Sequence, residues 1–194
     1  MPSLLLLVHS IATNGCNSVK GGLDMIVKLE KIINKSAAEI KEIWTTHNNN
    51  SGHPNSVLSS SEFDKFQKRS NTSPLFVLPL KRPIGFISYL VETQAGQSMF
   101  TSLEQYKRLG SLAPKIFTLT HYTELAAAKD LVLGRGEKYE RVITGDDCQE
   151  LITTMYMFYC NDALFQHVWN FNHRPAGFRW EDVMKQFSIK LEKK

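Results

Sequence analysis

The sequence predicts an α+β fold: an antiparallel β-sheet of five or six strands flanked by helices, with a helical N-terminal arm. Three observations predict it. Short strand-like segments follow one another between residues 74 and 136, and the links between them are shorter than the crossovers that parallel strands need. Amphipathic helical patterns lie on both sides of this region. At 194 residues, with 42% hydrophobic and 22% charged side chains, the chain has the composition of a globular domain with one core.

A helical arm and a linker are predicted over residues 23–56. Apolar side chains recur at intervals of three and four residues from Leu23 to Ile33, which is the period of a helix with one buried face. Ser36 and Glu39 then have the spacing of a capping box, in which each side chain bonds the backbone amide of the other residue. The polar stretch Asn48–Ser56 is predicted to be a linker, because asparagine, glycine and proline favour turns.

The sheet is predicted to follow a short helix capped by Ser59 or Ser61. The predicted strands are Leu75–Leu80, Ile84–Glu92, Ser98–Leu103, Lys115–Tyr122 and Leu131–Arg135. Side chains alternate between the two faces of a strand, so Phe117, Leu119 and His121 should share one face of the fourth strand. This alternation places apolar side chains on both faces of the sheet. A face that helices leave uncovered would be an apolar patch of the kind that binds partners.

Helices are predicted around the sheet. A helical turn with a loop is expected at Glu104–Ala113, and a short alanine-rich helix at Thr123–Asp130. The longest helix is predicted from Asp146 to Cys160, with acidic residues in its first turn, where they complement the helix dipole. Its apolar face is wide, so we expect it to lie across the sheet as the main core element. A last amphipathic segment is expected from Trp180 to Phe187.

The sequence contains no recognisable catalytic, cofactor or metal-binding motif. Nucleophile elbows, P-loops, dinucleotide fingerprints and zinc-hydrolase motifs are all missing from it. Its three cysteines cannot form a fully paired disulfide framework, and none lies in a C-x-x-C spacing. The net charge of +4 is too small to indicate nucleic-acid binding, and no apolar run approaches the length of a membrane span. We therefore expect no catalytic residue, cofactor, metal, nucleic-acid partner or membrane insertion.

One alternative hypothesis is enzymatic. His121 together with Cys148 or Cys160 would be the thiol and base of a small hydrolase or transferase. Against this, His121 alternates with Phe117 and Leu119 on one strand face, which is typical of a hydrogen-bonded core residue. The two cysteines lie in an apolar helical run, where cysteine usually acts as a small buried hydrophobe.

Seven short segments, in order and spacing, resemble one protein family. They are Ser36–Trp44, Phe76–Pro79, Phe100–Gly110, His121–Leu125, Leu131–Glu137, Phe158–Asp162 and Phe171–Pro175. Together they resemble the mitochondrial assembly factors that chaperone the beta subunit of the ATP synthase catalytic sector. The resemblance extends from about Leu23 to Phe187.

The resemblance implies a soluble protein of the mitochondrial matrix, without enzymatic activity or cofactor. We expect it to be monomeric. Such a chaperone binds the unassembled beta subunit, prevents its aggregation and releases it to the alpha subunit. From the residue patterns we expect three regions: residues 1–22, disordered or the remnant of a transit peptide; residues 23–56, the helical arm and linker; and residues 57–194, a single α+β domain, which the resemblance implies is a chaperone domain. Aromatic and arginine residues are enriched in binding hot spots. The candidate partner-binding residues in the matching segments are therefore Tyr106, Arg108, Tyr122, Arg135, Phe171 and Arg174.

Overall fold

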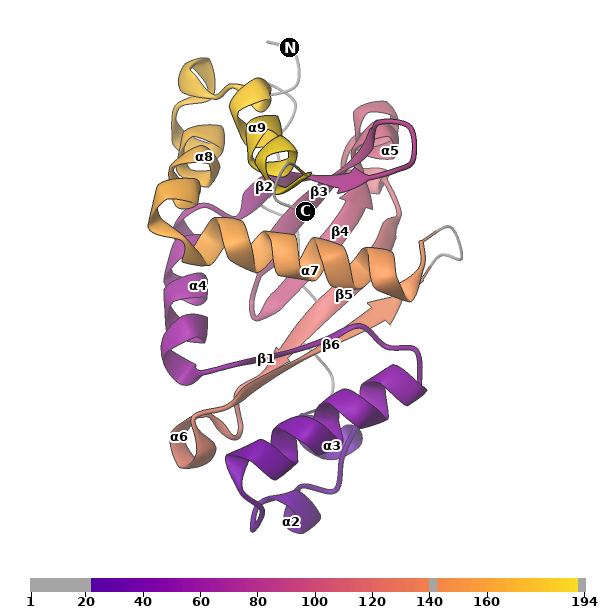
Figure 1. Ribbon diagram of the computed structural model, residues 1–194, viewed down its shortest axis with the longest axis vertical. Coiled ribbons are helices and arrows are strands. Elements are labelled where there is room, and N and C mark those ends of the chain that lie inside the picture. The colour runs from indigo at the N-terminus through magenta and orange to yellow at the C-terminus, as the bar shows by residue number, and fades with distance from the viewer. Residues whose placement is uncertain (1–21, 140–142, 192–194) are drawn as a thin grey trace.

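A computed structural model describes residues 22–139 and 143–191, and the side chains up to Phe187. Its centre is one six-stranded sheet with helices against both faces (Figure 1). The strands are β1 Asn55–Leu58, β2 Leu75–Lys81, β3 Phe86–Gln94, β4 Gln97–Ser102, β5 Lys115–Tyr122 and β6 Val132–Lys138. Their order across the sheet is β1-β6-β5-β4-β3-β2, and all neighbours are antiparallel. The predicted α+β fold is confirmed. The proposed transit remnant at residues 1–22 lies almost wholly outside the described residues.

Eight α-helices surround the sheet in the described part of the chain. They are α2 Leu29–Ile32, α3 Ala37–Asn50, α4 Ser60–Thr72, α5 Leu103–Leu109, α6 Ala126–Lys129, α7 Gly145–Cys160, α8 Asp162–His173 and α9 Trp180–Leu191. Short 3-10 turns are η1 Leu23–Met25, η2 Gly110–Leu112 and η3 Pro175–Gly177. Capping boxes start three of the long helices, at Ser36, Ser59 and Thr144. The predicted box at Ser36 is confirmed, and Ser59 is the residue that caps α4.

The five predicted strands form the meander β2 to β6, and the bounds of β5 are those predicted. The prediction that a strand begins at Ile84 is wrong, because β3 begins at Phe86. Residues 82–85 form a tight turn instead, closed by the Arg82 amide, which donates to the Gly85 carbonyl at 3.0 Å. Gly85 has a φ of +80°, a conformation that L side chains rarely adopt. Ile84 is therefore held at the tip of a hairpin.

The predicted linker Asn48–Ser56 is wrong at both ends. Helix α3 continues to Asn50, and β1 begins at Asn55, opposite Arg135 of β6. Asn48 is fully buried, and its side-chain amide donates to the Trp44 carbonyl at 2.8 Å. Composition favoured a loop here, but pairing with β6 overrides that local preference. The predicted boundary between residues 56 and 57 consequently falls inside β1.

The principal core lies between α7 and one face of the sheet, as predicted (Figure 1). From α7, Leu151, Met155 and Phe158 are completely buried. From the sheet, Phe100 and Phe117 of neighbouring strands are stacked with ring centroids 3.9 Å apart. The phenylalanine of β5 faces α7, in agreement with the predicted alternation of that strand.

A second, smaller core lies on the opposite face, beneath α3. Trp44 is 1% exposed, and its indole N–H donates to the Gly134 carbonyl at 3.2 Å. The predicted helix over Leu23–Ile33 is only the two short turns η1 and α2. Ile32 enters this core, whereas Ile33 is 43% exposed. The arm is therefore held by tertiary packing, because turns this short have little stability of their own.

At both edges of the sheet, a side-chain amide bonds the backbone of the first residue of the edge strand. At the start of β2, the Leu75 amide donates to Asn172 Oδ1 at 3.2 Å, and the Leu75 carbonyl accepts from Asn172 Nδ2 at 2.7 Å. At the start of β1, the Asn55 amide donates to Gln149 Oε1 at 3.0 Å. Pro79 within β2 has no backbone N–H to offer. Side-chain amides and a proline thus occupy positions where another strand would pair.

Candidate partner-binding surface

The three aromatic residues predicted to bind a partner are all buried. Tyr106 and Phe171, on α5 and α8, belong to the principal core at 7% and 1% exposure. Tyr122, at the end of β5, packs edge-on against Trp44 with ring centroids 6.1 Å apart. The structure thus gives each of these side chains a packing role within the chain.

The three predicted arginines lie on different elements. Arg108 is exposed on α5, and Arg174 is exposed beyond α8, with its guanidinium 5.2 Å from the ring centroid of Trp169. Arg135 is half-buried on β6, and its Nη2 lies 2.8 Å from Nε2 of His53. The structure therefore does not bring the predicted set together on one surface. Tyr106 and Arg108 share one helix.

His121 is the centre of a hydrogen-bonded chain across the principal core. Its Nδ1 lies 2.9 Å from the Gly96 carbonyl and its Nε2 lies 2.7 Å from the Tyr156 hydroxyl, which in turn lies 3.0 Å from the Ser56 hydroxyl. Because a carbonyl only accepts, the neutral ring carries its proton on Nδ1, and Tyr156 donates to Nε2. Burial lowers the pKa of His121 to about 4, so the ring is neutral at pH 7.

Neither of the two thiols of α7 takes part in the hydrogen-bonded chain through His121. Cys148 is fully buried, and burial raises its pKa to about 12. Cys160 is half-buried, burial raises the pKa of its thiol, and the sulfur lies 3.9 Å from the Glu62 carbonyl. Protonated thiols are poor nucleophiles, and both nitrogens of His121 are already engaged. The geometry gives no support to the alternative hypothesis of a cysteine–histidine enzyme.

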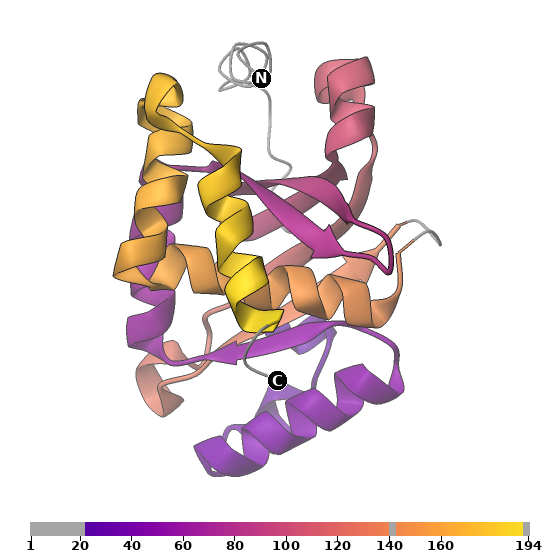
Figure 2. The same cartoon turned by 45° about the horizontal axis from the view of Figure 1, so that its top comes forward.

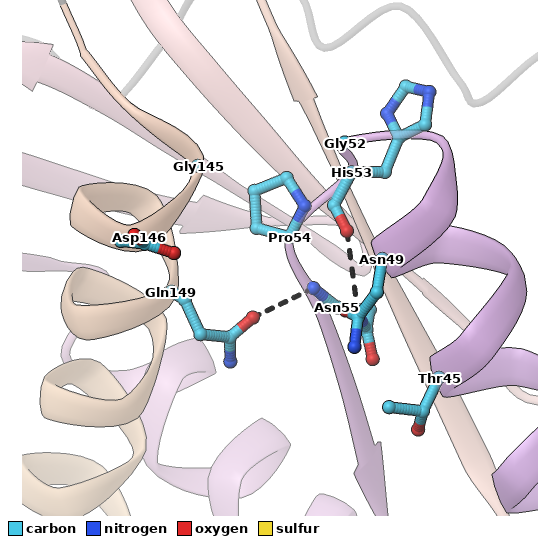
Figure 3. Close-up of a pocket in the computed structure, with 9 residues that line it drawn as sticks. All are labelled: Thr45, Asn49, Gly52, His53, Pro54, Asn55, Gly145, Asp146 and Gln149. Atoms are coloured by element: carbon cyan, nitrogen blue, oxygen red, sulfur yellow. Dashed lines mark hydrogen bonds between the residues drawn. The ribbon is translucent and has the colours of Figure 1, made fainter.

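A polar cavity of about 450 Å³ lies between the end of α3, the loop to β1 and the start of α7 (Figure 3). Its polar groups already bond one another. Besides its amide bond to Gln149, Asn55 donates from Nδ2 to Asn49 Oδ1 at 2.9 Å and to the His53 carbonyl at 3.4 Å. His53, in the predicted linker, is half-buried, with Nδ1 3.0 Å from the Gly136 carbonyl. These contacts fix the start of β1.

Within residues 22–139 and 143–191, no group of three or more histidine, cysteine, aspartate or glutamate residues is placed to hold a metal ion. No helix in the same part of the chain is long and apolar enough to cross a membrane.

Exposed large hydrophobic side chains gather at one end of the sheet. We call this set the apolar end: Ile84, Phe86, Ile87, Leu109, Leu112 and Tyr139. These residues lie in three segments at the end of the sheet where β2, β4 and β6 finish: the β2–β3 turn, the α5–η2 segment and the last residues of β6. At this end, the β2–β3 turn and α5 stand apart from each other (Figure 2). Ile84 is 96% exposed and Leu112 is 85% exposed. The apolar surface is thus at a sheet end, rather than across the second face as the sequence suggested.

The β2–β3 turn is held in place by contacts on either side of Ile84. Arg82 forms an ion pair with Asp147 in the first turn of α7. Phe86 packs edge-on against Phe187 of α9, with ring centroids 6.3 Å apart. A braced turn of this kind presents Ile84 to solvent as a fixed feature.

Sequence reasoning missed the apolar end, although the sequence carries a signal for it. Ile84 lies between Pro83 and Gly85, and Leu112 lies between Gly110 and Pro114. Proline and glycine mark turns, and turns lie at the surface. A large aliphatic residue between two such markers therefore indicates an exposed apolar side chain. The strand period over 84–92 hid this signal, because it assigned Ile84 to a strand.

Comparison with known proteins adds an independent observation. The family model described as "ATP11 protein" matches residues 11–184. The chain is 32% identical over 166 residues to "ATP synthase mitochondrial F1 complex assembly factor 1" of Danio rerio, covering 84% of this chain and 55% of the relative. The protein of the same name from Homo sapiens is 26% identical, with 84% and 51% covered. "Protein atp11, mitochondrial" of Schizosaccharomyces pombe is 25% identical, with 77% and 54% covered.

The chain spans about half the length of the curated relatives that it matches. The family match nevertheless covers most of this chain, including every strand of the sheet and the helices from α2 to α8. The motifs quoted from the sequence fall within the same region. The protein belongs to the ATP11 family.

Proposed function

We propose that this protein is a molecular chaperone for assembly of the catalytic sector of mitochondrial ATP synthase. It binds the unassembled beta subunit, prevents its aggregation and releases it to the alpha subunit. The observation that carries this proposal is membership of the ATP11 family, whose curated relatives are named F1 complex assembly factors. The family resemblance of the sequence motifs supports the beta subunit as the client and the mitochondrial matrix as the location.

The structure is consistent with binding rather than catalysis. An unassembled subunit exposes an apolar interface that aggregates unless it is covered. A transient cover needs apolar surface of its own, and the apolar end provides it. It must also bind moderately, so that the rightful partner displaces it by mass action.

Co-expression with the isolated beta subunit tests the proposal. We expect beta to become soluble and to co-purify with this protein, and we expect addition of the alpha subunit to release it. The control is co-expression of the alpha subunit alone, which should not co-purify. Beta that remains insoluble and uncomplexed would reject the proposed function.

A further inference from the structure

We propose that the apolar end is the surface through which this protein docks on the unassembled subunit. The docked surface of that subunit is apolar at its centre and acidic at its rim. This inference rests on the proposed function and adds to it the location of the site and the chemistry of the partner.

The first argument is the distribution of exposed apolar side chains. Eight large hydrophobic residues are exposed in the described part of the chain, and six of them form the apolar end. The other two, Met25 and Ile33, lie at the opposite end of the molecule, near α2 (Figure 1). Scattered single hydrophobic residues are normal on a protein surface, whereas six of eight at one end of the sheet indicate that this end contacts a partner.

The second argument is charge. The segments 81–87, 103–115 and 137–139, which carry the apolar end, contain six basic side chains and two acidic ones. The basic residues are Lys81, Arg82, Lys107, Arg108, Lys115 and Lys138; the acidic residues are Glu104 and Glu137. The Arg82 charge is engaged by Asp147, and the other five basic side chains are exposed. Complementary charge steers association, so the partner should be acidic around its contact area.

The same charge argues against a second copy of this chain as the occupant. A symmetric dimer through the apolar end would place the same surface on both sides of the interface. The basic side chains of the two copies would then face one another, and like charges across an interface disfavour association. A different protein, whose surface is apolar at the centre and acidic at the rim, would match both the exposed hydrophobic side chains and the basic side chains of this end.

Affinity for the purified, immobilised beta subunit tests the docking surface. In the variant Ile84→Ser/Leu112→Ser, both changed side chains are almost fully exposed, so folding should be unaffected. We expect this variant to lose at least tenfold in affinity for beta. The variant Lys107→Glu/Arg108→Glu should associate more slowly, and its association rate should lose the salt dependence of the unchanged protein.

Matched controls make the same changes at the opposite end of the molecule. Met25→Ser/Ile33→Ser removes exposed hydrophobic residues near α2, and Lys28→Glu/Lys31→Glu reverses exposed charges there. Both control variants should bind beta with unchanged affinity. Far-ultraviolet circular dichroism and urea unfolding confirm that all four variants are folded.

The outcomes separate the two proposals. Failure of the unchanged protein to bind beta rejects the proposed function, and the docking surface with it. Normal binding by the unchanged protein and by the apolar-end variants rejects the docking surface alone. Light scattering tests a second copy of this chain as the occupant of the apolar end. If the unchanged protein is a dimer, and Ile84→Ser/Leu112→Ser is a monomer that still binds beta, the apolar end serves self-association and the inference is overturned.

Discussion

Arg82 and Asp147 form a two-pronged ion pair between the β2–β3 turn and the first turn of α7. The distance from Arg82 Nη1 to Asp147 Oδ1 is 2.6 Å, and that from Nη2 to Oδ2 is 3.1 Å. The side chains are 27% and 15% exposed. Asp147 also accepts from the Thr144 amide in the capping box of α7. The hydrogen bonds from Arg82 contribute most, and together with those from Thr144 they hold the pKa of Asp147 below its usual range.

We expect Arg82→Ala to lower the free energy of unfolding by about 1–2 kcal/mol, because Asp147 would keep its charge in a half-buried place without a counter-charge. Arg82→Lys keeps the charge but loses the second hydrogen bond to Asp147. Its free energy of unfolding should therefore lie between those of Arg82→Ala and the unchanged protein. Urea unfolding at pH 7, followed by circular dichroism, measures both. Equal stability of Arg82→Ala and the unchanged protein would show that the pair contributes nothing.

The half-buried, hydrogen-bonded ring of His121 makes stability depend on pH. Its pKa is lowered in the folded protein, so the unfolded chain takes up a proton first as the pH falls below 6.5. Stability is therefore complete above pH 6.5 and decreases down to about pH 4. The free energy of unfolding lost over this pH range through His121 is about 3 kcal/mol.

The variant His121→Gln isolates this effect, because glutamine cannot titrate. We expect the stability advantage of the unchanged protein over His121→Gln to shrink between pH 7 and pH 4.5. Urea unfolding of both proteins at several pH values gives this difference. The contributions of the other titrating groups are the same in both proteins and therefore cancel. Parallel pH profiles of the two proteins would contradict the assignment.

Gly134 marks a close contact between β1 and β6. A Cβ atom at this position would lie 2.1 Å from Ser56 Oγ and 3.3 Å from Leu119 Cδ1. We expect Gly134→Ala to cost about 1–3 kcal/mol in unfolding free energy, as overpacking does. Ser56→Ala removes the nearest atom, so the cost of Gly134→Ala should be smaller in that background.

A double-mutant cycle by thermal unfolding measures this coupling. Gly136→Ala is the matched control, because its Cβ would meet the Pro54 carbonyl at 3.1 Å rather than Ser56. The Ser56→Ala background should leave the cost of Gly136→Ala unchanged. Additive effects of Gly134→Ala and Ser56→Ala would show that the strands move apart freely at this point.

The thiols of α7 should be inert in the folded protein. In a Cys16→Ser background, we expect a thiol reagent to leave Cys148 unmodified and to modify Cys160 slowly, because burial raises the pKa of both. Both should react promptly in urea. Mass spectrometry of the labelled peptides provides the measurement. Rapid modification of Cys148 under native conditions would contradict its burial.

Local patterns predicted most of this fold. The alternation in β5, the capping box at Ser36 and the apolar face of α7 depend on neighbours in the sequence, and the sequence contains those neighbours. Strand β1 could not be predicted in this way, because it has four residues and exists through its pairing with β6.

The candidate site was harder to predict than the fold. Residue type directed attention to Tyr106, Tyr122 and Phe171, yet aromatic residues are enriched in cores as well as in interfaces, and these three are buried. Which aromatic side chain reaches the surface depends on tertiary packing. The exposed Ile84 and Leu112 lie in turns, where turn chemistry is a better guide than hydrophobicity.

The side-chain amides at the two edges of the sheet bear on the proposed chaperone function. An exposed strand edge recruits extended chains, and unassembled subunits that aggregate would be a ready source of them. Asn172 and Gln149 occupy backbone groups of the two edge strands with side-chain amides, and Pro79 interrupts β2. Under the proposed function, a client would therefore be bound through side chains on the folded surface, and these positions of the edge strands would not be free to pair with an aggregating chain.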